Sequence, residues 1–309
     1  MEWDSTVLEH LFPGREYFLM VMKMSPMTVS YTHLDVYKRQ VQYSPVSKTC
    51  VMDIFLPEGE GPFPVIVSIH GGAFKKCDKR DEEMILDMLH GLDKGYAVVG
   101  VNYRLSQEAQ FPEPVKDIKQ AIRFIKDHAD EYNFDKEKIV VWGGSAGGYF
   151  ALMSGLIDCY DEFDDEYSSN TNTKIQGLVA WFPPVHFSNM DNQLKASGLL
   201  KVYPDHDDSQ SPESLFIGAP ITESYELVEK ANPETYLHTD ICPMFIQHGR
   251  EDMIVPYQQS QDFVKKAKII CGEEKIRYEI MEGANHGDPL FSTLENLNKV
   301  YAFIEECFR

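Results

Sequence analysis

The chain has 309 residues, of which 43% are hydrophobic and 25% charged, and these proportions exclude a disordered or fibrous chain. Lys and Arg number 29 against 49 Asp and Glu, giving a net charge of −20. This balance argues against nucleic-acid binding, which needs clustered cations, and against anionic membrane surfaces or highly anionic substrates. No apolar run approaches the roughly 20 residues of a transmembrane helix.

Cysteine and histidine spacing gives no sign of a metal site. The six cysteines, at positions 50, 77, 159, 242, 271 and 307, form no CxxC or zinc-ligand pattern. The histidines form no HExxH pair. The sequence therefore predicts no metal, no cofactor, and unpaired thiols in a reducing, cytoplasmic compartment. The sequence leaves open whether the chain forms a homo-oligomer.

The first forty residues show no regular pattern of polar and apolar positions. Residues 29–40 read VSYTHLDVYKRQ, and their codons can be written as an inverted repeat. Its two halves resemble the end sequence of a transposon used to prepare sequencing libraries. We therefore expect an assembly scar, and we set residues 1–40 apart from the fold. An ordinary N-terminal arm is the alternative interpretation.

From residue 41 onward, predicted strands alternate with predicted helices, and we expect one catalytic domain over residues 41–309. The strands are expected at 50–56, 65–69, 96–101, 138–142, 175–182, 244–247 and 276–281. The helices are expected at 81–94 and 114–132 and from about 145, 256 and 290. This alternation predicts an α/β fold with a mostly parallel sheet covered on both faces. Functional residues should then follow the carboxyl ends of strands.

Two segments interrupt the alternation. Residues 158–166 are strongly acidic, and we interpret them as a surface loop in preference to a cation site. Residues 183–240 are too long for a structureless connection and contain short helical patterns at 192–202, 212–216 and 222–230. We interpret this insertion as a small helical cap over the active edge of the sheet.

The residues GGSAG at 143–147 lie between a predicted strand and a predicted helix. A G-x-S-x-G sequence in this context is typical of a sharp turn that exposes a nucleophilic serine, here Ser145. The helix N-terminus favours negative charge that develops beside it. The glycines at both sides allow close backbone approach.

Three further strand ends carry residue types that acyl transfer requires. His70, Gly71 and Gly72 follow one strand, and Gly71 and Gly72 are candidate N–H donors to an oxyanion, together with Ala146. Asp252 and His286 follow two later strands, so the order Ser, Asp, His matches that of α/β-hydrolases. Glu251 is the rival acid, but the D-x-x-V-P pattern favours Asp252.

From about residue 50 to its end, the chain resembles α/β-hydrolase serine esterases, close to the hormone-sensitive-lipase-like and bacterial feruloyl-acetyl esterase branches. The matching stretches are HGGAF (70–74), NYRL (102–105), GGSAGG (143–148), HGREDMIVP (248–256) and ANHGD (284–288). The resemblance implies a nucleophile at Ser145, an acid at Asp252 and a base at His286. Position 73 departs from it, because lipase-like members usually carry HGGG.

We therefore expect a serine carboxylesterase that hydrolyses small acyl or aromatic-acid esters, such as acetyl or feruloyl esters of plant carbohydrate, through an acyl-enzyme. Its partner would be a small-molecule ester, with no nucleic acid and no membrane. Alternatives are an amidase or formamidase of the same fold, or a catalytically idle binding protein. The aromatic candidates for the substrate pocket are Phe74, Tyr149, Trp181, Phe182 and Phe187, and core packing is the equal alternative for them.

Overall fold

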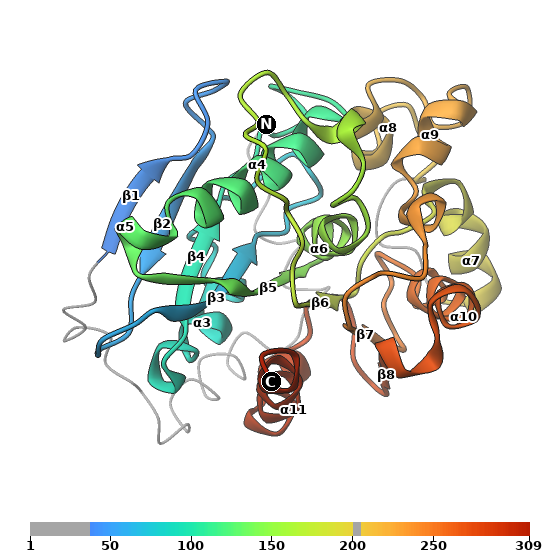
Figure 1. Ribbon diagram of the computed structural model, residues 1–309. Coiled ribbons are helices and arrows are strands. Elements are labelled where there is room, and N and C mark those ends of the chain that lie inside the picture. The colour runs from blue at the N-terminus through green and yellow to red at the C-terminus, as the bar shows by residue number, and fades with distance from the viewer. Residues whose placement is uncertain (1–37, 200–204) are drawn as a thin grey trace, which may run out of the picture. The chain divides into compact units, whose positions relative to one another are not determined.

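The computed structural model describes residues 38–199 and 205–309. In these ranges eight strands form one sheet, in the order β1-β2-β4-β3-β5-β6-β7-β8 (Figure 1). The strands are β1 (Lys38–Gln42), β2 (Val51–Phe55), β3 (Phe63–Ile69), β4 (Ala97–Val101), β5 (Phe134–Gly144), β6 (Gly177–Trp181), β7 (Met244–Gly249) and β8 (Ile276–Met281).

The sheet is parallel from β4 to β8, whereas β1 and β2 are antiparallel to their neighbours. In the centre, Val67 of β3 pairs with Val99 of β4 and Val141 of β5. All three valines are completely buried, as expected for strands covered on both faces. The predicted α/β-hydrolase architecture is confirmed, and every strand predicted from residue 50 onward is present.

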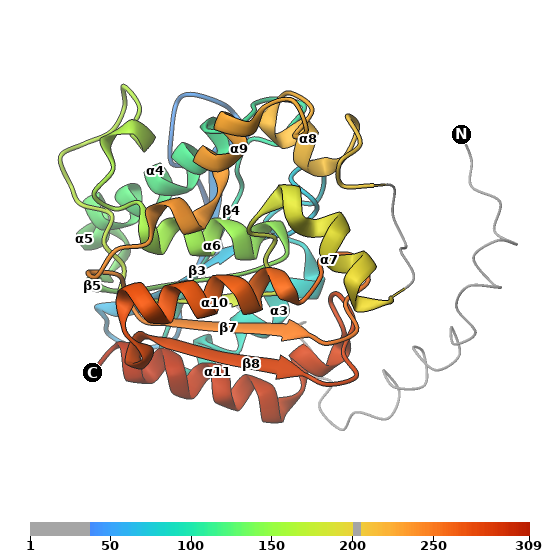
Figure 2. The same cartoon turned by 90° about the vertical axis from the view of Figure 1, so that its right-hand side faces the viewer.

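Helices cover both faces of the sheet (Figures 1 and 2). α3 (Glu82–Leu89) and α11 (Leu294–Cys307) pack on one face. α4 (Glu113–Asp127), α6 (Ala146–Leu156) and α10 (Gln258–Cys271) pack on the other. Short 3₁₀ turns, η6 (Glu273–Lys275) and η7 (Pro289–Ser292), precede β8 and α11.

Two predicted helices are shorter in the structure. The helix expected at 81–94 ends at Leu89, and a 3₁₀ turn, η2 (Leu92–Lys94), follows it between Gly91 and a left-handed Gly95 with φ 80°. The helix expected at 114–132 divides at His128 into α4 and a single turn, α5 (Ala129–Tyr132). The apolar pattern alone therefore overestimates the length of both helices.

The insertion between β6 and β7 is helical and packs on the α6 and α10 side of the sheet (Figure 2). Its elements are η4 (Phe187–Asn189), α7 (Met190–Ser197), α8 (Pro212–Ile217), α9 (Tyr225–Ala231) and η5 (Pro233–Tyr236). α8 begins where sequence chemistry favours it, because the Ser211 hydroxyl caps the Ser214 N–H and Pro212 occupies the first turn. That the insertion caps the active edge stays a prediction.

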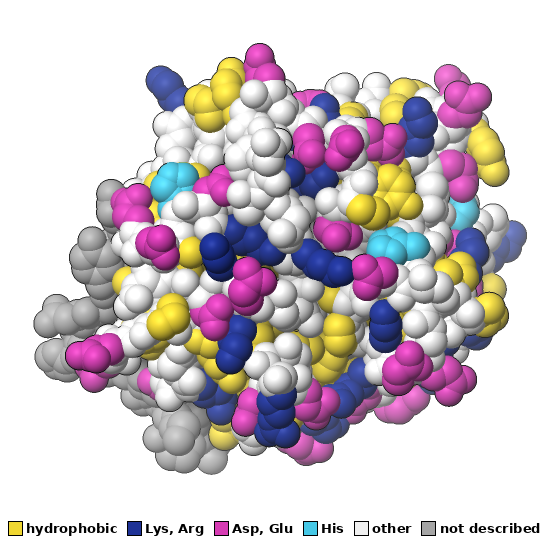
Figure 3. Space-filling view, viewed as in Figure 1, with side chains coloured by type: hydrophobic (Ala, Val, Ile, Leu, Met, Phe, Trp, Pro, Cys, Tyr) yellow, Lys and Arg dark blue, Asp and Glu magenta, His cyan; other side chains and the backbone are white. Residues whose placement is uncertain are grey.

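The acidic run is partly fixed rather than fully solvated. It contains a 3₁₀ turn, η3 (Asp161–Phe163), and Asp164 pairs with two cations of α4, Lys119 at 2.9 Å and Arg123 at 2.7 Å. On the face shown in Figure 3, acidic and basic side chains are interspersed. In the described ranges, no helix combines the length and the hydropathy needed to cross a membrane.

The N-terminal expectations fall mostly outside the described residues, since residues 1–37 are not among them. The exception is β1, whose first three residues, 38–40, belong to the segment that we set apart. They pair with β2 through the backbone, from Lys38 opposite Phe55 to Gln40 opposite Asp53.

Candidate active site

Ser145 lies at the sharp turn between β5 and α6, at the carboxyl edge of the sheet. Its backbone has φ 56° and ψ −124°, a sparsely populated conformation for a non-glycine residue. The turn is held by the Ser145 N–H, which donates to the Trp181 carbonyl of β6 at 2.9 Å. Position 147 requires glycine, because a Cβ there would overlap with the Ile69 carbonyl oxygen of β3.

The structure brings Asp252 and His286 to Ser145. The Ser145 hydroxyl lies 3.0 Å from His286 Nε2, and His286 Nδ1 donates to Asp252 Oδ2 at 2.7 Å. The Asp252 side chain is fully buried, whereas the His286 side chain is 14% exposed. Three residues that follow β5, β7 and β8 therefore form one hydrogen-bonded chain that ends at the hydroxyl of the half-buried Ser145.

Both oxygens of the Asp252 carboxylate accept hydrogen bonds. Oδ1 accepts the backbone N–H groups of Ile254 at 2.9 Å and Val255 at 2.8 Å. Burial by itself raises the pKa of Asp252, but the neighbouring His286 and a hydrogen bond from His248 outweigh it, so its pKa lies well below the usual value. Its neighbour Glu251 is exposed, so the geometry favours Asp252 as the partner of His286.

The loop after β3 approaches Ser145 closely. A Cβ added at Gly71 would lie 3.1 Å from the Gly144 carbonyl oxygen and 3.5 Å from the Ser145 Cβ. Gly72 has φ +103°, and a Cβ there would overlap with the Lys76 carbonyl oxygen, so this position also requires glycine. Ala146 is the first residue of α6, and its N–H is one of those that lack an intrahelical acceptor.

His70 supports this loop from below. Its Nδ1 lies 2.8 Å from the Gly71 carbonyl oxygen, which can only accept, so Nδ1 carries the proton. Its ring stacks on Tyr103 at 4.4 Å, and the Tyr103 hydroxyl lies 3.2 Å from the His70 carbonyl oxygen. Burial lowers the pKa of His70 to about 4, so the imidazole is neutral at pH 7. This arrangement fits a structural role.

All five aromatic pocket candidates are buried within the core. Phe74, Tyr149, Trp181 and Phe187 are each at most 2% exposed. Phe74 stacks on Phe216 of α8 at 4.2 Å, and the Tyr149 hydroxyl donates to the Ala231 carbonyl oxygen at 2.8 Å. Phe74 and Tyr149 therefore join the loop after β3 and α6 to the insertion, whereas Trp181 packs against Trp142 and Phe291.

Phe182 differs from the other four, because its ring centroid lies 4.6 Å from that of His286. Its backbone has φ 39°, and its N–H donates to the Gln247 carbonyl oxygen at 2.8 Å. The ring therefore packs directly beside the base of the candidate triad.

Two residues that the sequence analysis did not single out contact the candidate triad and its loops. His248 is fully buried, with Nδ1 2.7 Å from the Ser260 hydroxyl and Nε2 3.3 Å from Asp252 Oδ2. Asn285 accepts the N–H groups of Met253 at 3.1 Å and His286 at 2.8 Å. Their only sequence signal was adjacency to the motifs, since His248 opens HGRED and Asn285 directly precedes His286.

Arg104 of the NYRL stretch is bound to α4. It makes a bidentate contact with Asp117, at 2.9 Å from Nε and 2.7 Å from Nη2, and reaches Glu113 at 3.2 Å. Because Asp117 is nearly completely buried, this pair fixes the segment after β4 to the helix that follows it.

Relatives of this chain are esterases. It is 28% identical over 220 residues to the probable carboxylic ester hydrolase LipM of Mycobacterium tuberculosis, covering 71% of this chain and 48% of that protein. It is 24% identical over 259 residues to the esterase LipQ of the same organism, covering 83% of this chain and 58% of that protein. The chain thus spans about half the length of these curated relatives.

Solved structures of esterases share the fold of this chain. A truncated carbohydrate esterase from gut microbiota superposes with a TM-score of 0.78 at 25% identity, over 89% of this chain and 98% of that one. The propionate-bound esterase Est2 of Thermogutta terrifontis gives a TM-score of 0.68 at 19% identity, over 87% and 94%. The BD-FAE family model matches residues 52–267, and the chain therefore belongs to the BD-FAE family, within the α/β-hydrolase serine esterases.

Proposed function

We propose that the protein is a serine carboxylesterase that hydrolyses small acyl or aromatic-acid esters through an acyl-enzyme. The observation that carries this proposal is the chain of hydrogen bonds from the Ser145 hydroxyl through His286 to Asp252. Its geometry matches what nucleophilic catalysis needs, a hydroxyl within hydrogen-bond reach of a base that a third group orients.

In the proposed mechanism, Ser145 Oγ attacks the ester carbonyl carbon while its proton passes to His286 Nε2. Asp252 holds the imidazole with its proton on Nδ1 and stabilises the imidazolium. The carbonyl oxygen becomes an oxyanion, to which the N–H groups of Ala146, Gly71 and Gly72 would donate hydrogen bonds. The positive end of α6 lies beside it.

The two halves of the reaction use the same base. When the tetrahedral intermediate collapses, the C–O bond to the alcohol breaks and His286 returns the proton to the leaving oxygen. Water then attacks the acyl-enzyme, giving its proton to His286, and the acid leaves as Ser145 recovers its proton. No redox partner is needed, because only protons and an acyl group are transferred.

For the substrate, we propose acetyl or feruloyl esters of carbohydrate. The BD-FAE match and the structural similarity to a carbohydrate esterase support this class. We also propose a cytoplasmic location, because no disulfide joins any of the six cysteines. Fractionation of the native cells would contradict that location if the protein were found outside the cytoplasm.

The test is a panel of p-nitrophenyl acetate, butyrate and decanoate, methyl ferulate and acetylated xylan, assayed with the wild type and with Ser145→Ala. We expect turnover of the short p-nitrophenyl esters that is lost in Ser145→Ala. Comparison of acetylated xylan with methyl ferulate then selects between the two acyl classes. A folded wild type that hydrolyses no member of the panel would contradict the esterase proposal.

A further inference from the structure

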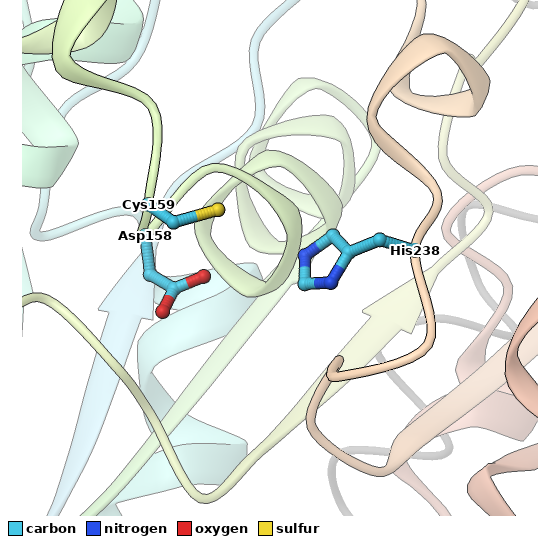
Figure 4. A group of neighbouring side chains, drawn as sticks. All are labelled: Asp158, Cys159 and His238. Carbon is cyan, nitrogen blue, oxygen red and sulfur yellow. The ribbon is translucent and has the colours of Figure 1, made fainter.

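A second cluster of reactive side chains lies away from Ser145 (Figure 4). Asp158, Cys159 and His238 come from two segments, the connection after α6 and the connection between η5 and β7. One ligand-type atom from each residue, a carboxylate oxygen, the thiol sulfur and an imidazole nitrogen, lies within 4.8 Å of the other two. Figure 4 shows the three side chains pointing toward one another.

The cluster is at the opposite end of α6 from the nucleophile. Ser145 is the residue before α6, and Asp158 follows its C-cap, Ile157. An eleven-residue helix separates its ends by about 16 Å. The cluster therefore shares no residue with the candidate triad.

We propose that Asp158, Cys159 and His238 bind one Zn²⁺ ion or a similar borderline-soft divalent cation. A thiolate, an imidazole and a carboxylate are the donors that zinc takes in proteins, whereas Mg²⁺ and Ca²⁺ take oxygen alone. A water molecule would complete the tetrahedron.

The spacing of the donor atoms allows this with small adjustments. A tetrahedral Zn²⁺ with Zn–S of about 2.3 Å and Zn–N of about 2.0 Å holds its ligand atoms roughly 3.3–3.8 Å apart. The three atoms now lie within 4.8 Å of one another, so movements of about 1 Å suffice. Cys159 is exposed and Asp158 half-buried, and both are small side chains that can turn into place.

The imidazole supplies an independent observation. His238 Nε2 is buried and has no hydrogen-bond partner among the described residues, an arrangement that folded proteins rarely leave unexplained. In Figure 4 the edge of the ring carrying this atom faces the other two side chains. A metal ion in the cluster would give Nε2 a partner, once the ring proton has moved to Nδ1.

Binding requires one proton to move within the His238 ring and one proton to leave the Cys159 thiol. His238 Nδ1 now accepts the Asp240 N–H at 3.2 Å, so Nε2 holds the ring proton. On metal binding this proton moves to Nδ1 and the contact with Asp240 opens. Because Asp240 is exposed, a water molecule can then accept the Asp240 N–H in place of Nδ1. Cys159 binds as thiolate and releases its proton to solvent.

The test uses the reduced full chain, stripped of metal and carrying no histidine tag. Co²⁺ is titrated first, because a thiolate ligand adds a charge-transfer band in the near ultraviolet, and Zn²⁺ affinity is then measured by competition with a chromophoric chelator. The variants are Cys159→Ser, His238→Gln and, as matched control, Cys77→Ser, which removes the other exposed cysteine.

We expect one equivalent of metal and a thiolate band for the wild type and Cys77→Ser. Cys159→Ser should lose the band, and Cys159→Ser and His238→Gln should each bind Zn²⁺ at least ten-fold more weakly. Zn²⁺ should raise the Tm of the wild type and not of these two variants. Absence of the band in the wild type, or wild-type affinity in either variant, would overturn the proposal. Hydrolysis of p-nitrophenyl acetate should be equal in all four proteins.

Discussion

Asp252 and Glu251 are adjacent carboxylates, and exchanging each for its amide tests which of them serves His286. In Asp252→Asn, the amide oxygen can keep the two backbone N–H bonds that Oδ1 now accepts from Ile254 and Val255. The amide NH₂ then faces His286 Nδ1 in place of Oδ2, which now lies 2.7 Å from it. Because an NH₂ group only donates, Nδ1 must become an acceptor.

This exchange changes the tautomer of the base. With Nδ1 unprotonated, the proton of neutral His286 sits on Nε2, which faces the Ser145 hydroxyl at 3.0 Å, and the lone pair that should take the serine proton is lost. The corresponding exchange in the triad of a serine protease lowers kcat by roughly 10⁴ for this reason. That is about 5.5 kcal/mol of activation free energy. The fold should persist, because both backbone bonds are kept.

The assay is kcat for p-nitrophenyl acetate, with near-ultraviolet circular dichroism and thermal unfolding as checks of the fold. Glu251→Gln is the matched control, because Glu251 is exposed and should keep nearly full activity. If Asp252→Asn retained more than about a tenth of kcat, or if Glu251→Gln lost as much, the assignment of the acid would be wrong.

Three further substitutions test separate parts of the structure. Ser145→Ala should lower kcat by several orders of magnitude and leave the Tm nearly unchanged; more than about a tenth of wild-type activity would refute the nucleophile. Tyr149→Phe should lower the free energy of unfolding by about 1–2 kcal/mol by leaving the buried Ala231 carbonyl oxygen unpaired, and should leave KM unchanged; a raised KM would return Tyr149 to the pocket. Asp87→Asn should raise the free energy of unfolding above pH 6 by about 3 kcal/mol, because burial raises the pKa of Asp87 to about 6 and its ionised form opposes folding. That gain should shrink between pH 6 and pH 4 in urea unfolding, and a gain independent of pH would contradict it.

The sheet and the candidate triad could be predicted because their signals are local. A buried parallel strand needs a short run of β-branched residues, and residues 65–69 and 96–101 are rich in them. Once the strands are located, the residues that follow them share one edge of the sheet. Ser145, Asp252 and His286 each follow a strand directly or within one short loop.

Features that depend on long-range packing could not be predicted. The sequence around Phe74 and Tyr149 is compatible with a pocket and with a core. Both rings lie in the core because the insertion brings Phe216 against them. Likewise, nothing in the spacing of Cys159 and His238 indicates that the segments after α6 and η5 bring them together. β1 reads KRQVQ, which is mostly polar, and pairs with β2 at the edge of the sheet, where burial leaves little trace in the sequence.

The scar hypothesis sets residues 1–40 apart from the fold, and two truncations test it by removing residues 1–36 without or with β1. A chain that begins at Tyr37 keeps β1, whose five residues pair with β2 from Lys38 opposite Phe55 to Gln42 opposite Val51. A chain that begins at Tyr43 lacks β1 and leaves that edge of β2 without its ladder. We expect the first truncation to keep the wild-type activity and Tm, and the second to lower the Tm, by about 2–4 °C for each kcal/mol of lost pairing. A fall of about ten degrees on removal of residues 1–36 alone would correspond to several kcal/mol, and such packing is not expected of a segment that did not evolve with this sheet.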